Sequence, residues 1–270
     1  MANRNSRGRI PQLIGMIHLG ALPGAPSSTK PLGALAAAAA QEATRLVDAG
    51  FDGVIIENMH DRPYLRREVG PEVVAAMTRC GEAVRGAIGT RAAVGVQTLA
   101  GANRAALAIA HAIDATFIRA EGFVFASVAD EGILDEADAG PLLRYRRTIG
   151  ANAIAVWADI KKKHSSHAIT ADLDLGETAR AAEFAGADAV IVTGTSTGAP
   201  TDPGDLEAVR AATSLPVVVG SGATAETISA LIDLADSVIV GSALKKGGRW
   251  DGALDGRRVS RFMRAAGRGS

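Results

Sequence analysis

The feature that most constrains the fold is a repeat of apolar run, polar loop and helix-forming segment along the whole chain. Eight apolar runs read as buried strands, because they are nearly continuous in aliphatic residues. They cover residues 10–18, 53–58, 91–97, 115–121, 153–159, 188–193, 217–219 and 237–240. Their carboxyl ends lie about 21 to 40 residues apart, which is the length that a repeated β-loop-α unit needs.

Eight such units with no break in composition predict a (β/α)8 TIM barrel of the α/β class. We expect residues 10–265 to form this single domain and residues 1–9 to form a disordered tail. A doubly wound sheet is the alternative. It is less favoured because no GxGxxG motif follows the first strand, and glycine turns follow the last two strands instead.

Those two glycine turns predict an anion site. Gly220, Ser221 and Gly222 follow one strand, and Gly241 with Ser242 follows the next. We expect a helix over residues 225–233 whose first turn is capped by the threonine at position 224. Glycine turns and a helix N-terminus offer unpaired N–H groups, and phosphate is their usual ligand. A simpler interpretation is a pair of tight barrel turns that hold water or sulfate.

In a TIM barrel, functional side chains lie at the carboxyl ends of the strands. This rule makes Glu57, Asp159 and Lys161 the candidate catalytic residues. Other polar residues near strand ends are candidates for substrate binding: His18, Asn58, Gln97, Arg119, Lys163, Thr193 and Thr195. A carboxylate at the barrel mouth costs desolvation energy unless it is paired or used. The alternative role for Glu57 is therefore a salt bridge to Lys161 or Arg119.

Composition argues against several functional classes. Lys+Arg and Asp+Glu both number 29, which disfavours nucleic-acid binding through general electrostatics. Every apolar run is far shorter than the roughly 20 residues of a membrane helix, and residues 1–9 lack the apolar core of a signal peptide. The single Cys80 allows no internal disulfide. We therefore expect a cytoplasmic protein.

Cofactor and metal signals are weak. His164 and His167 lie three residues apart, but no second cluster of metal-ligating residues accompanies them, so we predict no metal site. No nucleotide-cofactor motif is present, and we predict no cofactor.

Several sequence blocks resemble the BtpA/SgcQ family. They are IGMIHLGALPGAP, GVIIENMHDRPY, LLRYRRTIGA with WADIKKKHSS, VTGTSTGAPTDPGDL, and VVVGSGATAETI with ADSVIVGSALKKGG. The resemblance implies a barrel of the ribulose-phosphate-binding type. The family's named cyanobacterial member is associated with the accumulation or stability of photosystem I, and relatives also occur in organisms without photosynthesis. Relatives usually carry Asn where this chain has Gln97 and Glu121, so the substrate end of the site differs from theirs.

Two functions fit these observations. The first is an isomerase, epimerase or lyase that acts on a small sugar phosphate or phosphoribosyl compound. Glu57 and Asp159 would be general base and acid, and Lys161 would polarise a carbonyl or, less favourably, form a Schiff base. The second is a non-catalytic assembly or stability factor, which predicts an exposed apolar patch or an extended interaction segment.

Two segments bear on partners. The arginines of residues 257–264 could form such an interaction segment, but a simpler interpretation is that residues 257–264 form the last helix of the barrel. The loop at residues 19–31 is long enough to reach a second copy of the chain, and we expect a homo-oligomer.

Overall fold

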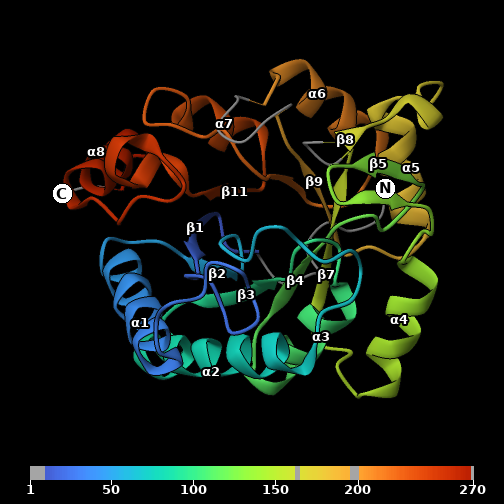
Figure 1. Cartoon of the computed structure of the whole chain (residues 1–270). Coiled ribbons are helices and arrows are strands. Elements are labelled where there is room, and N and C mark those ends of the chain that lie inside the picture. The colour runs from blue at the N-terminus through green and yellow to red at the C-terminus, as the bar shows by residue number, and fades with distance from the viewer. Residues whose placement is uncertain (1–9, 162–164, 195–200, 269–270) are drawn as a thin grey trace.

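The computed structural model describes residues 10–161, 165–194 and 201–268. Within these residues, eight parallel strands close a barrel in the order β1-β11-β10-β9-β7-β4-β3-β2 (Figure 1). The strands are β1 (Leu13–His18), β2 (Gly53–Glu57), β3 (Ala93–Gln97), β4 (Phe117–Ala120), β7 (Ala155–Ile160), β9 (Ala189–Val192), β10 (Val217–Val219) and β11 (Ser237–Val240). The TIM barrel predicted from the spacing of the apolar runs is confirmed.

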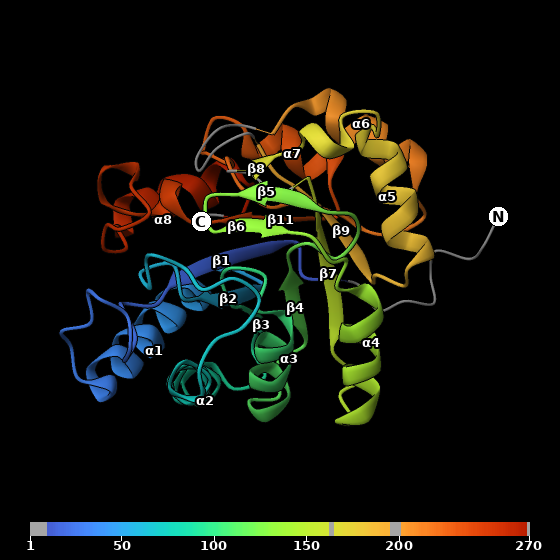
Figure 2. The same ribbon diagram turned by 45° about the vertical axis from the view of Figure 1, so that its right-hand side comes forward.

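Helices cover the outside of the barrel, as Figures 1 and 2 show. They are α1 (Leu32–Asp48), α2 (Pro71–Ile88), α3 (Asn103–Ala112), α4 (Ala139–Thr148), α5 (Leu175–Phe184), α6 (Pro203–Ala212), α7 (Ile228–Leu234) and α8 (Gly256–Ala265). The alanine-rich α1 shows why they pack closely. Its buried residues recur at helical spacing, so one stripe of small and aliphatic side chains faces the sheet: Leu35, Ala36, Ala39, Ala43 and Leu46.

The barrel interior is filled by side chains below the mouth. The rings of Phe117 and Trp157 stack with centroids 3.9 Å apart and an angle of 12° between their planes. Gly95 makes room for this pair, because a Cβ there would lie 2.2 Å from the Phe117 ring. Among the described residues, the stacked rings and the aliphatic residues around them fill the lower part of the barrel, which leaves the carboxyl ends of the strands as the place where a ligand would bind.

A small antiparallel sheet lies outside the barrel. It contains β5 (Ser127–Ala129), β6 (Gly132–Leu134) and β8 (Ser165–Ser166), and Figure 2 shows the β5–β6 hairpin as a separate layer. Sequence reasoning expected only a polar loop after the fourth barrel strand. Three-residue strands carry too little periodic signal to be recognised, and here their pairing depends on β8, which is distant in sequence.

The loop at residues 19–31 folds back onto its own barrel. Leu19 and Leu22 are buried, and the N–H of Leu22 donates to Oδ1 of Asp61 at 2.7 Å. This part of the loop is therefore committed to its own chain. The homo-oligomer expected from its length stays a prediction.

Candidate active site

The alternation of side chains along each strand explains how polar residues reach the mouth. Residues two apart in a strand point to the same face. In β1, the interior residues Ile14 and Met16 lead to His18, and in β3, Gly95 leads to Gln97. In each of the other strands, an interior residue is likewise followed two positions later by the residue at the strand end. These pairs are Ile55 and Glu57, Phe117 and Arg119, Trp157 and Asp159, Ile191 and Thr193, Val218 and Gly220, and Ile239 and Gly241.

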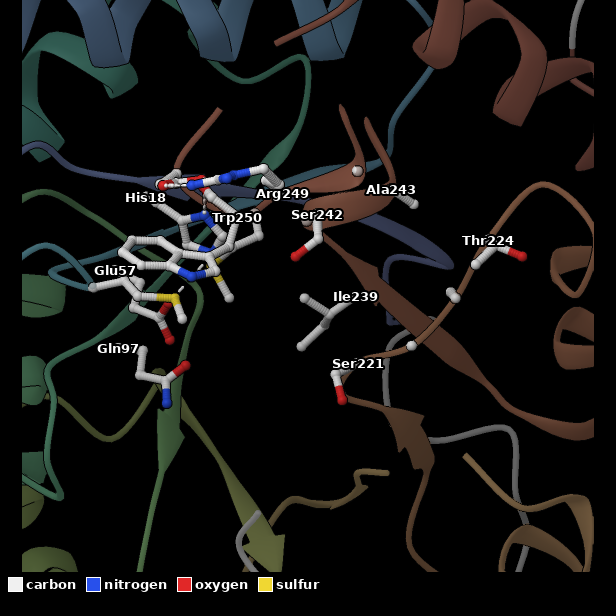
Figure 3. A pocket seen from close by; sticks show the side chains of 18 of the residues that line it. His18, Glu57, Gln97, Ser221, Thr224, Ile239, Ser242, Ala243, Arg249 and Trp250 are labelled. Carbon is white, nitrogen blue, oxygen red and sulfur yellow. Dashed lines mark hydrogen bonds and ion pairs between the residues drawn. The ribbon is translucent and has the colours of Figure 1, made fainter. Parts of the chain in front are cut away.

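These strand ends, apart from Asp159 and Thr193, border a cavity of about 780 Å³ at the mouth. Figure 3 shows its two walls: His18, Glu57 and Gln97 lie on one side, and Ser221, Thr224, Ser242 and Ala243 lie on the other. A volume of this size accommodates a small metabolite. The structure thus places ionisable side chains and the two glycine turns around the same space.

His18 and Glu57 form a pair, and the contacts of the His18 ring show which of its nitrogens carries a hydrogen. Nδ1 of His18 lies 2.9 Å from the carbonyl oxygen of Trp250, and because a carbonyl only accepts, Nδ1 is the donor. Nε2 of the same ring lies 3.4 Å from Oε2 of Glu57. The proton that can move is therefore the one between His18 Nε2 and Glu57. Glu57 thus has an ion pair with His18. Its charge also acts on Arg119, where it helps to raise the pKa of the guanidinium, in line with one of the two partners that the alternative role named.

Arg119 and Asp159 form a buried ion pair beneath the cavity. Nε of Arg119 donates to Oδ2 of Asp159 at 2.8 Å, and Nη2 donates to Oδ1 at 3.1 Å. Burial acts to lower the pKa of Arg119, but the charge and hydrogen bonds of Asp159 outweigh it and raise the pKa. Nη1 donates to the carbonyl oxygen of Gly220 at 3.2 Å. Asp159 therefore holds a charged guanidinium under the glycine turn, and Arg119, not Asp159, borders the cavity.

The two glycine turns form the wall opposite the His18–Glu57 pair. Five N–H groups of these turns have no acceptor within the described residues: Ser221, Gly222, Ala223, Ser242 and Ala243. Gly220 is required here, since a Cβ would lie 2.5 Å from Ile191. Gly222 has a φ of +81°, a conformation that favours glycine. We call these two turns, residues 220–224 and 241–243, the cradle.

The expected helix over residues 225–233 was wrong in its start. The helix α7 begins at Ile228, and Thr227, not Thr224, precedes it. The hydroxyl groups of the two threonines explain the difference. Oγ1 of Thr224 accepts from the N–H of Glu226 at 3.2 Å, and Oγ1 of Thr227 accepts from the N–H of Thr224 at 3.0 Å. Together with the bond from the N–H of Ile228 to the carbonyl oxygen of Thr224 at 3.0 Å, they form a turn over residues 224–227 that leads into α7.

Gln97 and Asn58 have different surroundings, although both were predicted to bind substrate. Gln97 borders the cavity, and its Nε2 donates to Oε1 of Glu121 at 3.2 Å. Asn58 is buried behind the wall, where its amide joins Leu99 to Asp61 at 2.7 and 3.1 Å. Asn58 thus connects two loops and does not reach the cavity.

Lys161 does not face the cavity. It borders a second hollow between α5 and α6, and its Nζ donates to the carbonyl oxygen of Leu173. Thr193 ends the interior series of β9 but is not among the residues around the cavity. Lys163 and Thr195, together with His164, lie outside the described residues. In the described part of the chain, no three His, Cys, Asp or Glu residues gather in a metal-binding arrangement.

Several cavity residues were not identified from the sequence. Trp250 follows η3 (Lys246–Gly248), and its ring contacts His18 edge-on with centroids 6.1 Å apart. Arg258 in α8 borders the cavity beside the cradle, where its Nε donates to the carbonyl oxygen of Ala243 at 2.8 Å. Asp130 and Glu131 reach the opposite end on the turn of the β5–β6 hairpin. None of them follows a barrel strand directly, so the strand-end rule could not find them.

The segment 257–264 forms most of the closing helix α8, which was the simpler of its two interpretations. Its N-cap is Asp255, whose carboxylate accepts from the N–H groups of Arg257 and Arg258. This cap starts the helix where Arg258 can turn toward the cradle.

Comparison with known proteins agrees with the sequence blocks described above. A profile of the BtpA family matches residues 9–268. The chain belongs to the BtpA family. A Caenorhabditis elegans protein labelled mitochondrial is 44% identical to it over 257 residues, covering 94% of this chain and 92% of that protein. The photosystem I biogenesis protein BtpA of Synechocystis is 38% identical over 258 residues, covering 95% of this chain and 88% of the relative.

Solved structures resemble this BtpA-family chain in fold. One is (S)-3-O-geranylgeranylglyceryl phosphate synthase from Thermoplasma acidophilum with sn-glycerol-1-phosphate. Its TM-score is 0.60 at 16% identity, and the match covers 95% of this chain and 93% of the other. Another is phosphoribosyl anthranilate isomerase from Thermus thermophilus, with a TM-score of 0.58, 10% identity, and 95% and 98% of the two chains covered. At these identities the similarity establishes the TIM barrel alone.

The described residues also bear on membrane association. No helix among them combines the length and the apolar character that crossing a bilayer requires.

Proposed function

We propose that this BtpA-family protein is an enzyme that acts on a small phosphorylated metabolite, a sugar phosphate or phosphoribosyl compound, as an isomerase, epimerase or lyase. The observation that carries the proposal is the placement of the cradle opposite the His18–Glu57 pair in one cavity. The names of the structurally similar enzymes are compatible with a phosphorylated ligand.

The cradle supplies the phosphate site. Backbone N–H groups without acceptors bind phosphate oxygens strongly, because the donor positions are fixed before the ligand arrives. Arg258 adds a positive charge beside them, although its Nε already donates to Ala243. Phosphate binding would anchor one end of the substrate and leave the other end near Glu57.

The His18–Glu57 pair supplies the proton-transfer chemistry. Glu57 is the general base, and His18 exchanges the proton through Nε2, while the carbonyl oxygen of Trp250 holds Nδ1 in its protonated form. Arg119 borders the same cavity and would stabilise negative charge that develops on a substrate oxygen. Asp159 then positions Arg119, and Lys161 is not part of this mechanism.

A thermal-shift panel tests the proposal. It compares inorganic phosphate, sugar phosphates, phosphoribosyl compounds and their dephosphorylated forms, since a ligand at 100 times its Kd adds about 2.7 kcal/mol of stability. Ser242→Asp should abolish stabilisation, because a carboxylate in the cradle repels phosphate. Gln41→Glu adds the same charge on the exposed face of α1 and should retain it.

A second variant separates binding from chemistry. Glu57→Gln should keep phosphate binding and lose turnover of whichever compound the panel identifies. Stabilisation by dephosphorylated sugars equal to that by the phosphates would exclude the proposal.

The second candidate function is a non-catalytic assembly factor, the role that the name of the Synechocystis relative describes for that protein. One observation favours it: Val128 and Ile133 pair across the β5–β6 hairpin with 39% and 51% exposed surface. Exposed apolar pairs of this kind occur in protein interfaces. This function gains support if no phosphorylated compound stabilises the protein.

The cytoplasmic location and the homo-oligomer remain predictions. Fractionation of cells and light scattering of the purified chain would test them. The mitochondrial label of the Caenorhabditis elegans relative makes the location worth measuring.

A further inference from the structure

A closed turn after the last barrel strand carries Trp250 to the wall of the cavity. Its two ends are joined by an antiparallel bridge between Lys245 and Leu254. Gly252 lets the chain turn back on itself between these ends, because a Cβ there would lie 2.7 Å from a backbone oxygen of the same turn. The backbone of this turn therefore defines its shape, and we call residues 245–254 the Trp250 segment.

Contacts of the indole ring attach the middle of this segment to the barrel. The charged side chains on either side of Trp250 pair with each other, since Nε and Nη2 of Arg249 donate to the two carboxylate oxygens of Asp251 at 3.0 and 2.7 Å. The indole ring lies 4.8 Å from the ring of His60, measured between centroids, and the guanidinium carbon of Arg62 lies 4.9 Å from the indole centroid. Contacts of both kinds are attractive, so the loop that follows β2 holds the ring in place.

His18 meets Trp250 through both the backbone and the ring of that residue, and Figure 3 shows the two side chains on the same wall of the cavity as Glu57. Nδ1 of His18 donates to the carbonyl oxygen of Trp250 at 2.9 Å, and the two rings meet edge-on at an angle of 82°. The hydrogen bond made by one ring nitrogen decides which tautomer a histidine adopts. Any residue at position 250 offers a carbonyl, but the contacts of the indole ring fix where that carbonyl lies.

We infer that Trp250 is a positioning residue, whose indole ring holds the backbone carbonyl that keeps a proton on Nδ1 of His18. Nε2 is then the nitrogen that faces Glu57 and exchanges a proton with it. The catalytic importance of this arrangement rests on the proposed function, in which His18 and Glu57 carry out proton transfer. The tautomer itself does not depend on the cradle or on a phosphate, so it can be measured in the free protein.

Nitrogen NMR of the full chain without ligand tests the inference. The signals of the His18 ring are assigned by their loss in His18→Gln and are followed as the ring is titrated to its neutral form. In the unaltered protein, Nδ1 should keep the chemical shift of a protonated nitrogen throughout, while Nε2 alone loses its proton. Trp250→Ala should lower the ratio of the Nδ1–H to the Nε2–H tautomer by about tenfold, the effect of one lost hydrogen bond.

Three further variants separate positioning by the ring from a general loss of structure. Trp250→Phe should restore most of the Nδ1–H tautomer, because a phenyl ring can still pack against His60. His60→Ala leaves the Trp250 segment whole and should shift the tautomer in the same direction as Trp250→Ala, by a smaller amount. Phe184→Ala removes an aromatic ring that is 95% exposed at the end of α5 and should have no effect.

The outcomes separate this inference from the proposed function. If Nδ1 of His18 stays protonated in both Trp250→Ala and His60→Ala, the inference is overturned and the proposed function stands. The same holds if Trp250→Phe changes the tautomer as much as Trp250→Ala does. If no phosphorylated compound binds but the tautomer shifts as expected, the proposed function fails and the positioning of His18 by Trp250 stands.

Discussion

Arg119 and Asp159 share two hydrogen bonds inside the barrel, and a third bond from Arg119 fixes the carbonyl oxygen of Gly220 in the cradle. The two side chains are 4% and 1% exposed. A charge pair so deeply buried is costly to break, because removing one partner leaves the other charge without compensation.

Asp159→Asn tests this relationship. We expect it to lower the free energy of unfolding by about 3–5 kcal/mol, measured by chemical denaturation. The control is Asp48→Asn at the exposed pair with Arg91, where both side chains are about half exposed and the loss should be about 0.2–1 kcal/mol. Similar losses at the two sites would show that Asp159 is not a buried ionic partner.

Lys161→Met tests the role that strand-end reasoning gave to this lysine. Because Lys161 borders the hollow between α5 and α6, we expect phosphate affinity to change by less than about twofold, within the effect of a distant surface charge. Ser242→Asp in the same titration provides the positive control. A loss comparable to that of Ser242→Asp would place Lys161 at the phosphate.

Gly220→Ala tests the packing beneath the cradle. The added methyl group would meet Ile191 at 2.5 Å and Thr193 at 2.7 Å, so we expect a loss of about 1–3 kcal/mol and weaker phosphate binding. Gly86→Ala is the matched control: it lies exposed in α2 with no atom within 4 Å of the new methyl group. That change should stabilise the protein by about 0.5–1 kcal/mol. Unaltered stability of Gly220→Ala would contradict the packing described here.

Cys80 gives a pH-dependent prediction. Burial raises the pKa of this thiol to about 11, whereas an unfolded cysteine titrates near 8.5. The stability that the buried, protonated Cys80 thiol contributes to the folded state is therefore complete below pH 8.5. It is lost as the pH rises toward 11, because the thiol of the unfolded chain releases its proton first.

Labelling of Cys80 with a thiol reagent at pH 8 provides the measurement. With a pKa of about 11, about one thiol in a thousand is ionised in the folded protein, and the reagent is also excluded by burial. We expect labelling to require unfolding and to be fast in guanidinium. Rapid labelling of the native protein would refute this.

The carboxyl ends of the predicted strands located most of the candidate site, because the apolar runs and the alternation of side chains along a strand can both be recognised in the sequence. The ends of β1, β2 and β3 fall at His18, Glu57 and Gln97, as predicted. A strand covered on both faces must be apolar until it reaches solvent, so the first polar residue at its carboxyl end marks the mouth. The glycine turns were recognisable for a related reason, since at Gly220 a side chain would collide with Ile191 and at Gly241 it would be tight against His18 and Met16.

The partners of these residues were not visible in the sequence. Asp159 was expected to be a general acid, but it lies beside Arg119, 40 residues away in the chain. Lys161 is only two residues beyond Asp159, yet its backbone turns through a φ of +52° and its side chain leaves the mouth. Asn58 lies one residue past the interior position Glu57, and alternation turns it into the wall.

The sequence by itself therefore determined the barrel, the family and the residues that end each strand, because these depend on burial patterns that repeat along the chain. Only the tertiary structure decided which charges pair and which loops close the mouth. Trp250, Arg258 and the β5–β6 hairpin reach the cavity from segments with no local signal, and His18 meets Trp250 across 232 residues. Pairing of this kind depends on distances in space, which the order of residues does not contain.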